Sequence, residues 1–283
     1  MAVTVPAERR AVALPDQGPR AVPVVLGAAT VCSQILYPLV QGSVRDTVTV
    51  ISVVLFFAAS VSHAAVWRGW RFAAVLVAVT AGGGLLVEAA GVATGVPFGA
   101  YTYGDSLGVK LLGVPVVIPL AWTMMGYPAL LVGARIGRDR WWTPLVAGAA
   151  LASWDLFLDP QMVDAGHWLW RGGSGPEVLG IPILNFVAWF VIATAMMAVL
   201  GRVPARGYWV VDDAQRAAVR TGDPDRQRAA VRTADRVPFA LYLWTYASSV
   251  LAHAAFFGLP GSALLGGVGM GIVVALLLRV LRR

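Results

Sequence analysis

The chain has 283 residues, of which 58% are hydrophobic and only 13% are charged. Soluble domains carry about 25% charged residues, so this composition excludes an ordinary soluble protein and indicates an integral membrane protein. The net charge of +7 would favour nucleic-acid binding in a soluble protein, but the positions of the basic residues give it another meaning here. The single cysteine, Cys32, excludes an intrachain disulfide.

Residues 1–21 contain arginines and prolines but no apolar core followed by a cleavage-like site, so we interpret them as a cytoplasmic tail and not as a signal peptide. Beyond them, apolar runs long enough to cross a bilayer recur along the chain. Runs of this length in lipid are helical, because a helix satisfies all of its own backbone hydrogen bonds. The fold class predicted is an all-α integral membrane bundle of about eight transmembrane helices. The predicted spans are 22–40, 48–66, 72–92, 112–134, 142–158, 181–201, 237–257 and 262–281.

The basic residues orient these spans. If both termini are cytoplasmic, 19 of the 22 Lys and Arg residues fall in inner segments, and only Arg45, Lys110 and Arg171 fall in outer ones. Such an asymmetry is the positive-inside pattern of a multi-pass protein, here expected in the cell membrane. The net positive charge is therefore a topology signal, and no nucleic-acid partner is expected.

The same analysis divides the chain into four parts. Residues 1–21 form the cytoplasmic tail, and residues 22–201 form a membrane core that is expected to hold the active site. Residues 202–236 form a basic cytoplasmic loop that we expect to be flexible. Residues 237–283 add two further helices to the membrane domain.

Ionisable side chains inside membrane spans are costly and commonly mark function. Glu88 lies near the outer end of the third span, Asp155 and Asp159 lie at the outer end of the fifth, and Asn185 opens the sixth from the same side. The third and fifth spans each lead into an aromatic-rich outer loop, 91–105 and 159–173. Three acids and two loops are thus expected to converge at one membrane face.

Asp155 and Asp159 are four residues apart and share one helix face, and Pro160 lets the helix stop there. Two such close carboxyl groups in apolar surroundings are expected to hold one proton between them, which suits general acid–base chemistry. The alternative is structural: Asp159 could cap the helix, and Asp155 could satisfy buried backbone groups or pair with Arg171. Glu88 on the same face favours a site.

The aromatic residues at this face allow two interpretations. Tyr101, Tyr103, Trp154, Trp168 and Trp170 could form the aromatic belt found at membrane boundaries, or they could line a pocket and stabilise a cation. The three histidines, His63, His167 and His253, have no metal-ligand spacing, so no metal site is expected.

Four ordered stretches, 88–108, 114–128, 154–170 and 180–190, resemble the carotenoid biosynthesis family of membrane-bound carotenoid hydratases. The resemblance extends over about residues 80 to 200. It implies addition of water to the terminal double bond of an acyclic carotenoid end, which gives a tertiary alcohol without a redox cofactor. The implied partners are the acyclic carotenoid, water, the lipid bilayer and other enzymes of the carotenoid pathway.

The resemblance places the catalytic acids at Glu88, Asp155 and Asp159, and either aspartate could protonate the alkene. The remaining carboxylate or Glu88 would deprotonate the incoming water. Substrate binding is expected at Tyr101, Tyr103, Trp122, Trp154, Trp168, Trp170 and Asn185.

Two other functions compete with this one. The Asp155–Asp159 spacing also fits an aspartate-rich membrane prenyltransferase such as a lycopene elongase, but no second aspartate-rich motif is present. A transporter or carotenoid-carrying scaffold could use the acids as a proton relay, although the two halves of the chain show no convincing repeat.

Overall fold

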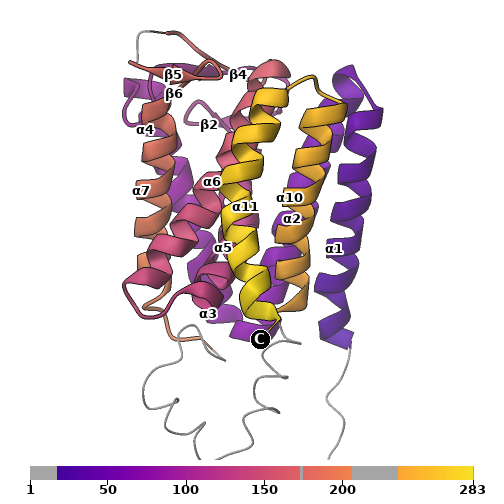
Figure 1. Cartoon of the computed structure of the whole chain (residues 1–283), viewed down its shortest axis with the longest axis vertical. Helices are drawn as coiled ribbons and strands as arrows, with labels where there is room; N and C mark the ends of the chain where they lie inside the picture. The colour runs from indigo at the N-terminus through magenta and orange to yellow at the C-terminus, as the bar shows by residue number, and fades with distance from the viewer. Residues whose placement is uncertain (1–17, 173–174, 206–234, 283) are drawn as a thin grey trace, which may run out of the picture.

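The structure is a computed structural model, and it describes residues 18–172, 175–205 and 235–282. Most of the predicted cytoplasmic tail and of the predicted basic loop, including its expected flexibility, therefore lies outside the described residues. Eight helical columns in these ranges stand side by side as a bundle (Figure 1). The columns are α1 (Gly18–Leu36), extended by η1 (Tyr37–Leu39), α2 (Gly42–Arg68), the segmented third column, α5 (Val117–Ile136), α6 (Trp142–Asp164), α7 (Ile183–Leu200), α10 (Arg236–Ala255) and α11 (Pro260–Leu281).

The third column consists of three consecutive pieces. These are α3 (Trp70–Val77), the π-helical turn η2 (Ala78–Gly82) and α4 (Gly83–Thr94). A π-helical turn inside a longer helix commonly occurs at functional sites. The sequence predicts a single span here. The π-helical turn ends at Gly82, the first of three consecutive glycines.

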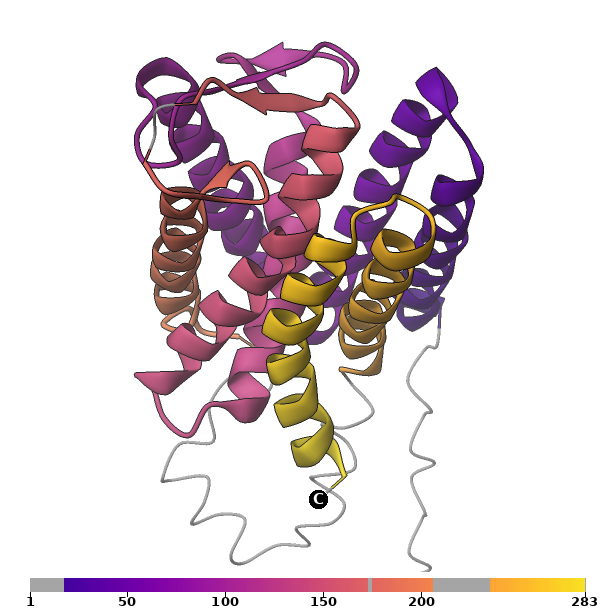
Figure 2. The same cartoon turned by 45° about the horizontal axis from the view of Figure 1, so that its top comes forward.

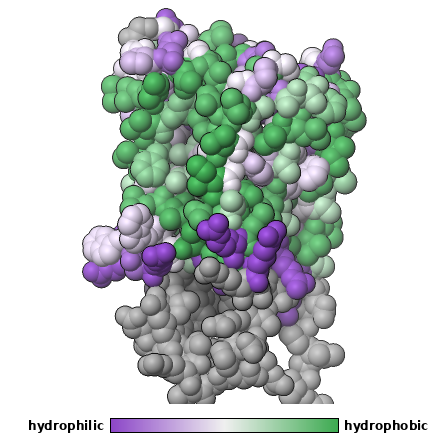
Figure 3. Space-filling view, viewed as in Figure 1, coloured by the Kyte–Doolittle hydropathy of each residue, from purple (hydrophilic) through white to green (hydrophobic). Residues whose placement is uncertain are grey.

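The predicted membrane bundle is confirmed. In the described residues, six helices are long and apolar enough to cross a membrane by length and composition. Helices α6 and α10 are outside that set, although at 23 and 20 residues they have spanning length. Figure 3 shows a broad apolar belt across the visible face of the bundle, bordered by hydrophilic side chains. Helix α1 begins and α11 finishes at the same end of the bundle (Figure 1).

Three short β-ribbons at the opposite end add to the predicted all-α fold (Figure 1). Each pairs two antiparallel strands: β1 (Tyr101–Tyr103) with β4 (Trp168–Trp170), β2 (Lys110–Leu111) with β3 (Val114–Pro115), and β5 (Glu177–Val178) with β6 (Ile181–Pro182). Figure 2, with this end turned forward, shows the ribbons lying over the helix ends. The β1–β4 ribbon joins segments that are far apart in the sequence.

Helix α5 forms the centre of the bundle. It is buried along nearly its whole length and contacts α2, α6, α10 and α11. A helix that is apolar on all sides belongs in such a position. Its few polar side chains bond to neighbouring helices: the hydroxyls of Thr123 and Thr80 are 2.7 Å apart.

Helix α6 continues through Pro160 to Asp164, so the expectation that it ends at Asp159 is wrong. Proline cannot donate the backbone hydrogen bond to the residue four positions earlier. Here the carbonyl of Leu156 accepts a bond from the Ser262 hydroxyl of α11 instead, at 2.8 Å. A neighbouring helix that replaces the lost donor allows proline inside a membrane helix.

The same device recurs in α5. Pro128 leaves the carbonyl of Met124 without its helical donor, and the Ser60 hydroxyl of α2 donates to that carbonyl at 2.8 Å. In both α5 and α6, a serine of an adjacent helix therefore supplies the hydrogen bond that the proline cannot donate.

Candidate active site

The β1–β4 ribbon joins the two aromatic loops that are expected to converge. Tyr101 lies opposite Trp170, and Tyr103 lies opposite Trp168. Alternate residues of a strand face the same side, so both tyrosines face one way and both tryptophans lie beside them. The ring centroids of Tyr101 and Trp170 are 5.7 Å apart, and those of Tyr103 and Trp168 are 5.6 Å apart. The four rings form one aromatic cluster.

Glu88 of α4 is buried beneath this ribbon and accepts three side-chain hydrogen bonds. The Tyr101 and Tyr103 hydroxyls donate to Oε2 at 2.5 and 2.8 Å. The Trp122 indole Nε1 of α5 donates to Oε1 at 3.1 Å. Both carboxyl oxygens therefore have partners, as a buried polar group requires.

Two glycines on α4 allow these donors to approach Glu88. A Cβ atom on Gly84 would lie 2.7 Å from Cγ of Trp122, and one on Gly91 would lie 2.8 Å from the Phe98 ring and 2.9 Å from the Tyr101 hydroxyl. All three distances are well inside van der Waals contact. The glycines stand about one turn before and one turn after Glu88, on the same side of the helix.

The two aspartates of α6 are bridged by one amide. Nδ2 of Asn185, in the first turn of α7, donates to Oδ2 of Asp155 at 3.0 Å and to Oδ2 of Asp159 at 2.5 Å. All three side chains are buried, and Oδ1 of Asp155 has no hydrogen-bond partner. The arrangement excludes the alternative in which Asp155 pairs with Arg171. Glu88 lies close enough to both aspartates to interact with them electrostatically.

A cavity of about 430 Å³ opens beside these acids. This volume lies within the range of small-molecule sites. Among the residues predicted to act, all but one line it, and the exception is Asp155. The lining residues of that set are Glu88, Asp159, Tyr101, Tyr103, Trp122, Trp154, Trp168, Trp170 and Asn185. Asp159 therefore faces the cavity, and Asp155 stands behind it.

The aromatic residues at this face line the cavity and do not form a boundary belt. Tyr101, Trp154 and Trp168 are each only 5% exposed. Exposed tryptophans occur near the other end of the bundle, where Arg71 and Arg140 lie over the rings of Trp70 and Trp141. The pocket interpretation of the outer aromatics is thus the one that the structure supports.

Burial raises the pKa of the Tyr101 phenol, and the nearby Glu88 charge raises it further. The pKa of the Tyr103 phenol is raised for the same two reasons. Both phenols belong to the ribbon outside the helices and stay protonated at neutral pH. They therefore act as hydrogen-bond donors to Glu88.

The three histidines lie in three separate environments. The ring of His63 is 2.9 Å from the Tyr127 hydroxyl, that of His167 is 2.7 Å from the Ser106 hydroxyl, and that of His253 is 3.0 Å from the Phe157 carbonyl. Within the described ranges, no three His, Cys, Asp or Glu side chains are grouped so as to hold a metal ion.

Sequence reasoning missed two parts of the site. Trp189 of α7 stacks on Trp122 with ring centroids 4.0 Å apart and an interplanar angle of 6°. Further cavity residues come from α1, η1, α2, α6, α10 and the turn after α10, namely Gln34, Tyr37, Thr49, Ser52, Gln161, Trp244, Thr245, Ser249 and Phe257. Gln34 could have been found, because amides inside membrane spans are rare. The others give no sequence signal.

The bundle and its buried acids define a polytopic membrane protein with an internal cavity that is lined mostly by apolar and aromatic side chains. The chain belongs to the family described as carotenoid biosynthesis protein, which matches residues 48–220. A 110-residue stretch is 36% identical to bisanhydrobacterioruberin hydratase of Haloarcula japonica. That match covers 37% of this chain and 36% of the relative. No solved structure shows a significant match to the chain.

Proposed function

We propose that this protein is a carotenoid hydratase. It adds water to the terminal double bond of an acyclic carotenoid end and forms a tertiary alcohol, a reaction that needs no redox cofactor. The observation that carries this proposal is that Glu88 and Asp159 line one mostly apolar and aromatic cavity, with Asp155 held behind Asp159 by the same Asn185 amide. The family and the relative named as a hydratase support it.

Asp159 is the proposed proton donor, because it is the member of the aspartate pair that lines the cavity. Asp155 and Asn185 position it: the Asn185 amide holds one oxygen of each carboxyl group, and the pair keeps one proton. The proton of Asp159 adds to the less substituted carbon of the alkene. The π electrons form the new C–H bond, and the positive charge remains on the tertiary carbon.

Aromatic faces stabilise this cation. Trp122 and Trp189 stack against each other and both line the cavity. A cation over an aromatic face in a dry site gains about 2 kcal/mol. Water then attacks the tertiary carbon, and the new oxygen loses a proton to Glu88. Transfer of that proton back to the aspartate pair restores the starting state of the enzyme. The net reaction is the addition of one water to the alkene to give the tertiary alcohol.

We further propose that the site lies at the extracytoplasmic side of the cell membrane, with both termini in the cytoplasm. The basis is the distribution of Lys and Arg, of which 19 of 22 fall on one side of the eight spans. The polyene would then lie among lipid tails while water reaches the site from the ribbon end. Cysteine labelling of Asp105→Cys and Arg138→Cys from outside intact cells tests this orientation: we expect only the former to react.

The cavity chemistry disfavours prenyl transfer. Among the described residues that line the cavity, none is lysine or arginine, although a diphosphate leaving group would need such partners. The Asp159 carboxyl group is also occupied by Asn185. Activity that requires magnesium and a prenyl diphosphate would restore the prenyltransferase alternative.

The test is expression in a host that accumulates lycopene or another acyclic carotenoid. We expect pigments heavier by one water and, when membranes from that host hydrate preformed carotenoid in deuterium oxide, one non-exchangeable deuterium on the carbon next to the new alcohol. The matched control is the same host with an empty vector. Wild-type protein that inserts in the membrane but yields no hydrated pigment from any acyclic carotenoid would contradict the proposal.

A further inference from the structure

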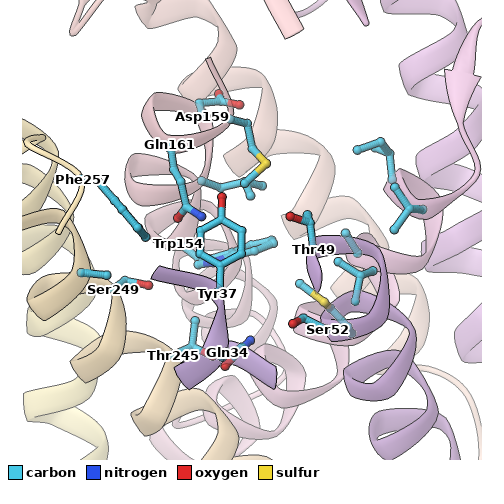
Figure 4. Close-up of a pocket in the computed structure, with 18 of the residues that line it drawn as sticks. Gln34, Tyr37, Thr49, Ser52, Trp154, Asp159, Gln161, Thr245, Ser249 and Phe257 are labelled. Atoms are coloured by element: carbon cyan, nitrogen blue, oxygen red, sulfur yellow. The ribbon is translucent and has the colours of Figure 1, made fainter. Parts of the chain in front are cut away.

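The cavity does not end at the acids. It continues past Gln161 and Tyr37 to Gln34 and Thr245, so that it reaches from α6 to α1 and α10 (Figure 4). At the acid end, Glu88 and Asp159 are buried, each only 3% exposed. The cavity thus has one buried end at the acids and a second end between α1 and α10.

The second end reaches the apolar outer surface. Four large apolar side chains line the cavity there and are also strongly exposed: Ile35 at 50%, Leu39 at 66%, Leu251 at 60% and Phe256 at 53%. Ile35 and Leu39 come from α1 and η1, and the other two come from α10 and the turn after it. Apolar side chains cover most of the outer face of these helices (Figure 3). A lateral opening at this place faces lipid.

The opening has definite limits. Toward the inner end of the bundle, α1 and α10 are in close contact, because a Cβ on Gly27 would lie 3.3 Å from Val237. Higher up, the Trp244 indole donates to Oε1 of Gln34 at 2.9 Å and ties the two helices together. Beyond that bond, residues of α1, η1 and α10 line the cavity.

At the ribbon end, an aromatic cap separates the opening from water. The rings of Tyr37 and Phe257 meet edge to face with centroids 5.6 Å apart. The guanidinium of Arg45 lies over both rings, at 5.5 and 6.0 Å from their centroids. With the cap in place, the cavity opens toward the lipid side of the bundle and not toward water.

Three hydroxyls on this part of the wall are not free to donate to a polar ligand, because their protons are already donated within the bundle. Thr49 donates to the carbonyl of Arg45 at 2.9 Å, Thr245 to that of Leu241 at 2.8 Å, and Ser52 to the Ser33 hydroxyl at 2.8 Å. At these three positions the cavity meets methyl groups and lone pairs, and the rest of this stretch is mostly apolar, with the side-chain amides of Gln34 and Gln161. This surface suits a hydrocarbon chain.

We propose that the gap between α1–η1 and α10 is a lateral portal through which a carotenoid passes one end to the acids while its polyene remains in the bilayer. The inference rests on the proposed function, and it assigns a role to α1 and α10. A carotenoid polyene approaches the thickness of the bilayer core, about 30 Å. A cavity of about 430 Å³ can therefore enclose only one end, and the rest of the chain passes between Ile35 and Leu251.

Ala247→Trp tests the portal. Ala247 is exposed on α10 and lines the cavity, so an indole there fills the gap. Ala240→Trp is the matched control, because Ala240 is also an exposed alanine on the same helix, two turns away, and does not line the cavity. Each variant is assayed in liposomes with an acyclic carotenoid and with a short acyclic terpene that carries the same terminal alkene.

We expect Ala247→Trp to lower kcat/KM for the carotenoid by about tenfold or more. Changes of this size are usual when one side chain no longer fits the substrate. Its turnover of the short terpene and both activities of Ala240→Trp should stay at the wild-type level. Unchanged carotenoid turnover in Ala247→Trp would overturn the portal, and so would an equal loss on both substrates.

A binding measurement separates the portal from the hydratase assignment. Carotenoid binding quenches tryptophan fluorescence, and its rate can be followed without turnover. If the wild type binds carotenoid but hydrates nothing, the proposed function fails, and the portal is then judged by binding alone. Slower binding to Ala247→Trp than to Ala240→Trp supports it, and equal rates overturn it.

Discussion

Ser262 donates its hydroxyl hydrogen bond to the carbonyl of Leu156, the carbonyl that Pro160 leaves without a helical donor. This contact couples α11 to the part of α6 that carries both aspartates. It keeps the helix continuous through Asp155 and Asp159, so that both carboxyl groups face the same neighbour, Asn185. The contact is remote from the substrate, but it determines how the acids are presented.

Ser262→Ala should therefore destabilise the protein by about 1 to 2 kcal/mol, because it leaves a buried carbonyl unsatisfied. In a Pro160→Ala background the same change should cost less, since an alanine at that position supplies the missing backbone donor. Thermal unfolding in detergent of the wild type, the two single variants and the double variant measures this coupling. Equal costs of Ser262→Ala in both backgrounds would show that the bond does not compensate for the proline.

The two aspartates should differ when each is replaced by asparagine. Asp159→Asn removes the acid that lines the cavity, and we expect hydration to fall by about 100-fold or more, the range that general acid catalysis contributes. Asp155→Asn should cost less, because Asp155 does not line the cavity. Initial rates with pigment extraction measure both. Asp164→Asn, on the exposed end of the same helix, is the control and should retain full activity. A larger loss in Asp155→Asn than in Asp159→Asn would reassign the proton donor.

Gly84 should tolerate no side chain. Gly84→Ala places a methyl group 2.7 Å from Cγ of Trp122 and forces the indole away from Glu88. Overpacking of this kind costs about 1 to 3 kcal/mol, and hydration should fall with it. Gly82→Ala is the matched control, two residues earlier in the same column, since its Cβ would meet no atom within 4 Å. Melting temperature and turnover of the two variants are compared directly. A Gly84→Ala protein as stable and as active as Gly82→Ala would disprove the close approach.

The ribbon end should weaken on acidification. Burial lowers the pKa of His167, and the nearby Asp46 opposes this effect. A histidine whose pKa is lowered in the folded state stabilises that state above its ordinary pKa, and the stability is lost as the pH falls through the lowered value. The wild type should lose thermal stability between about pH 7 and about pH 5, the range in which histidine titrates. His167→Gln keeps a partner for Ser106 but does not titrate, so it should lose less. Equal losses in both proteins would exclude His167 as the source.

Much of the architecture can be predicted from the amino-acid order. The length and apolar content of each run place the eight columns, because only helices of that length satisfy their backbone bonds in lipid. The costly acids Glu88, Asp155 and Asp159 mark one end of the bundle for the same reason. The convergence of loops 91–105 and 159–173 follows from the topology, because both leave the membrane on the same side.

The arrangement of the site required the tertiary structure. Whether α6 stops at Pro160 depends on a hydroxyl about a hundred residues away, which no local pattern reveals. The choice between a boundary belt and a pocket for the outer aromatics depends on the pairing of β1 with β4, and the roles of Trp189, Gln34 and Trp244 depend on which helices become neighbours. Local sequence determines backbone propensity and burial, whereas contacts between distant helices depend on packing, and here packing selects which acid faces the cavity.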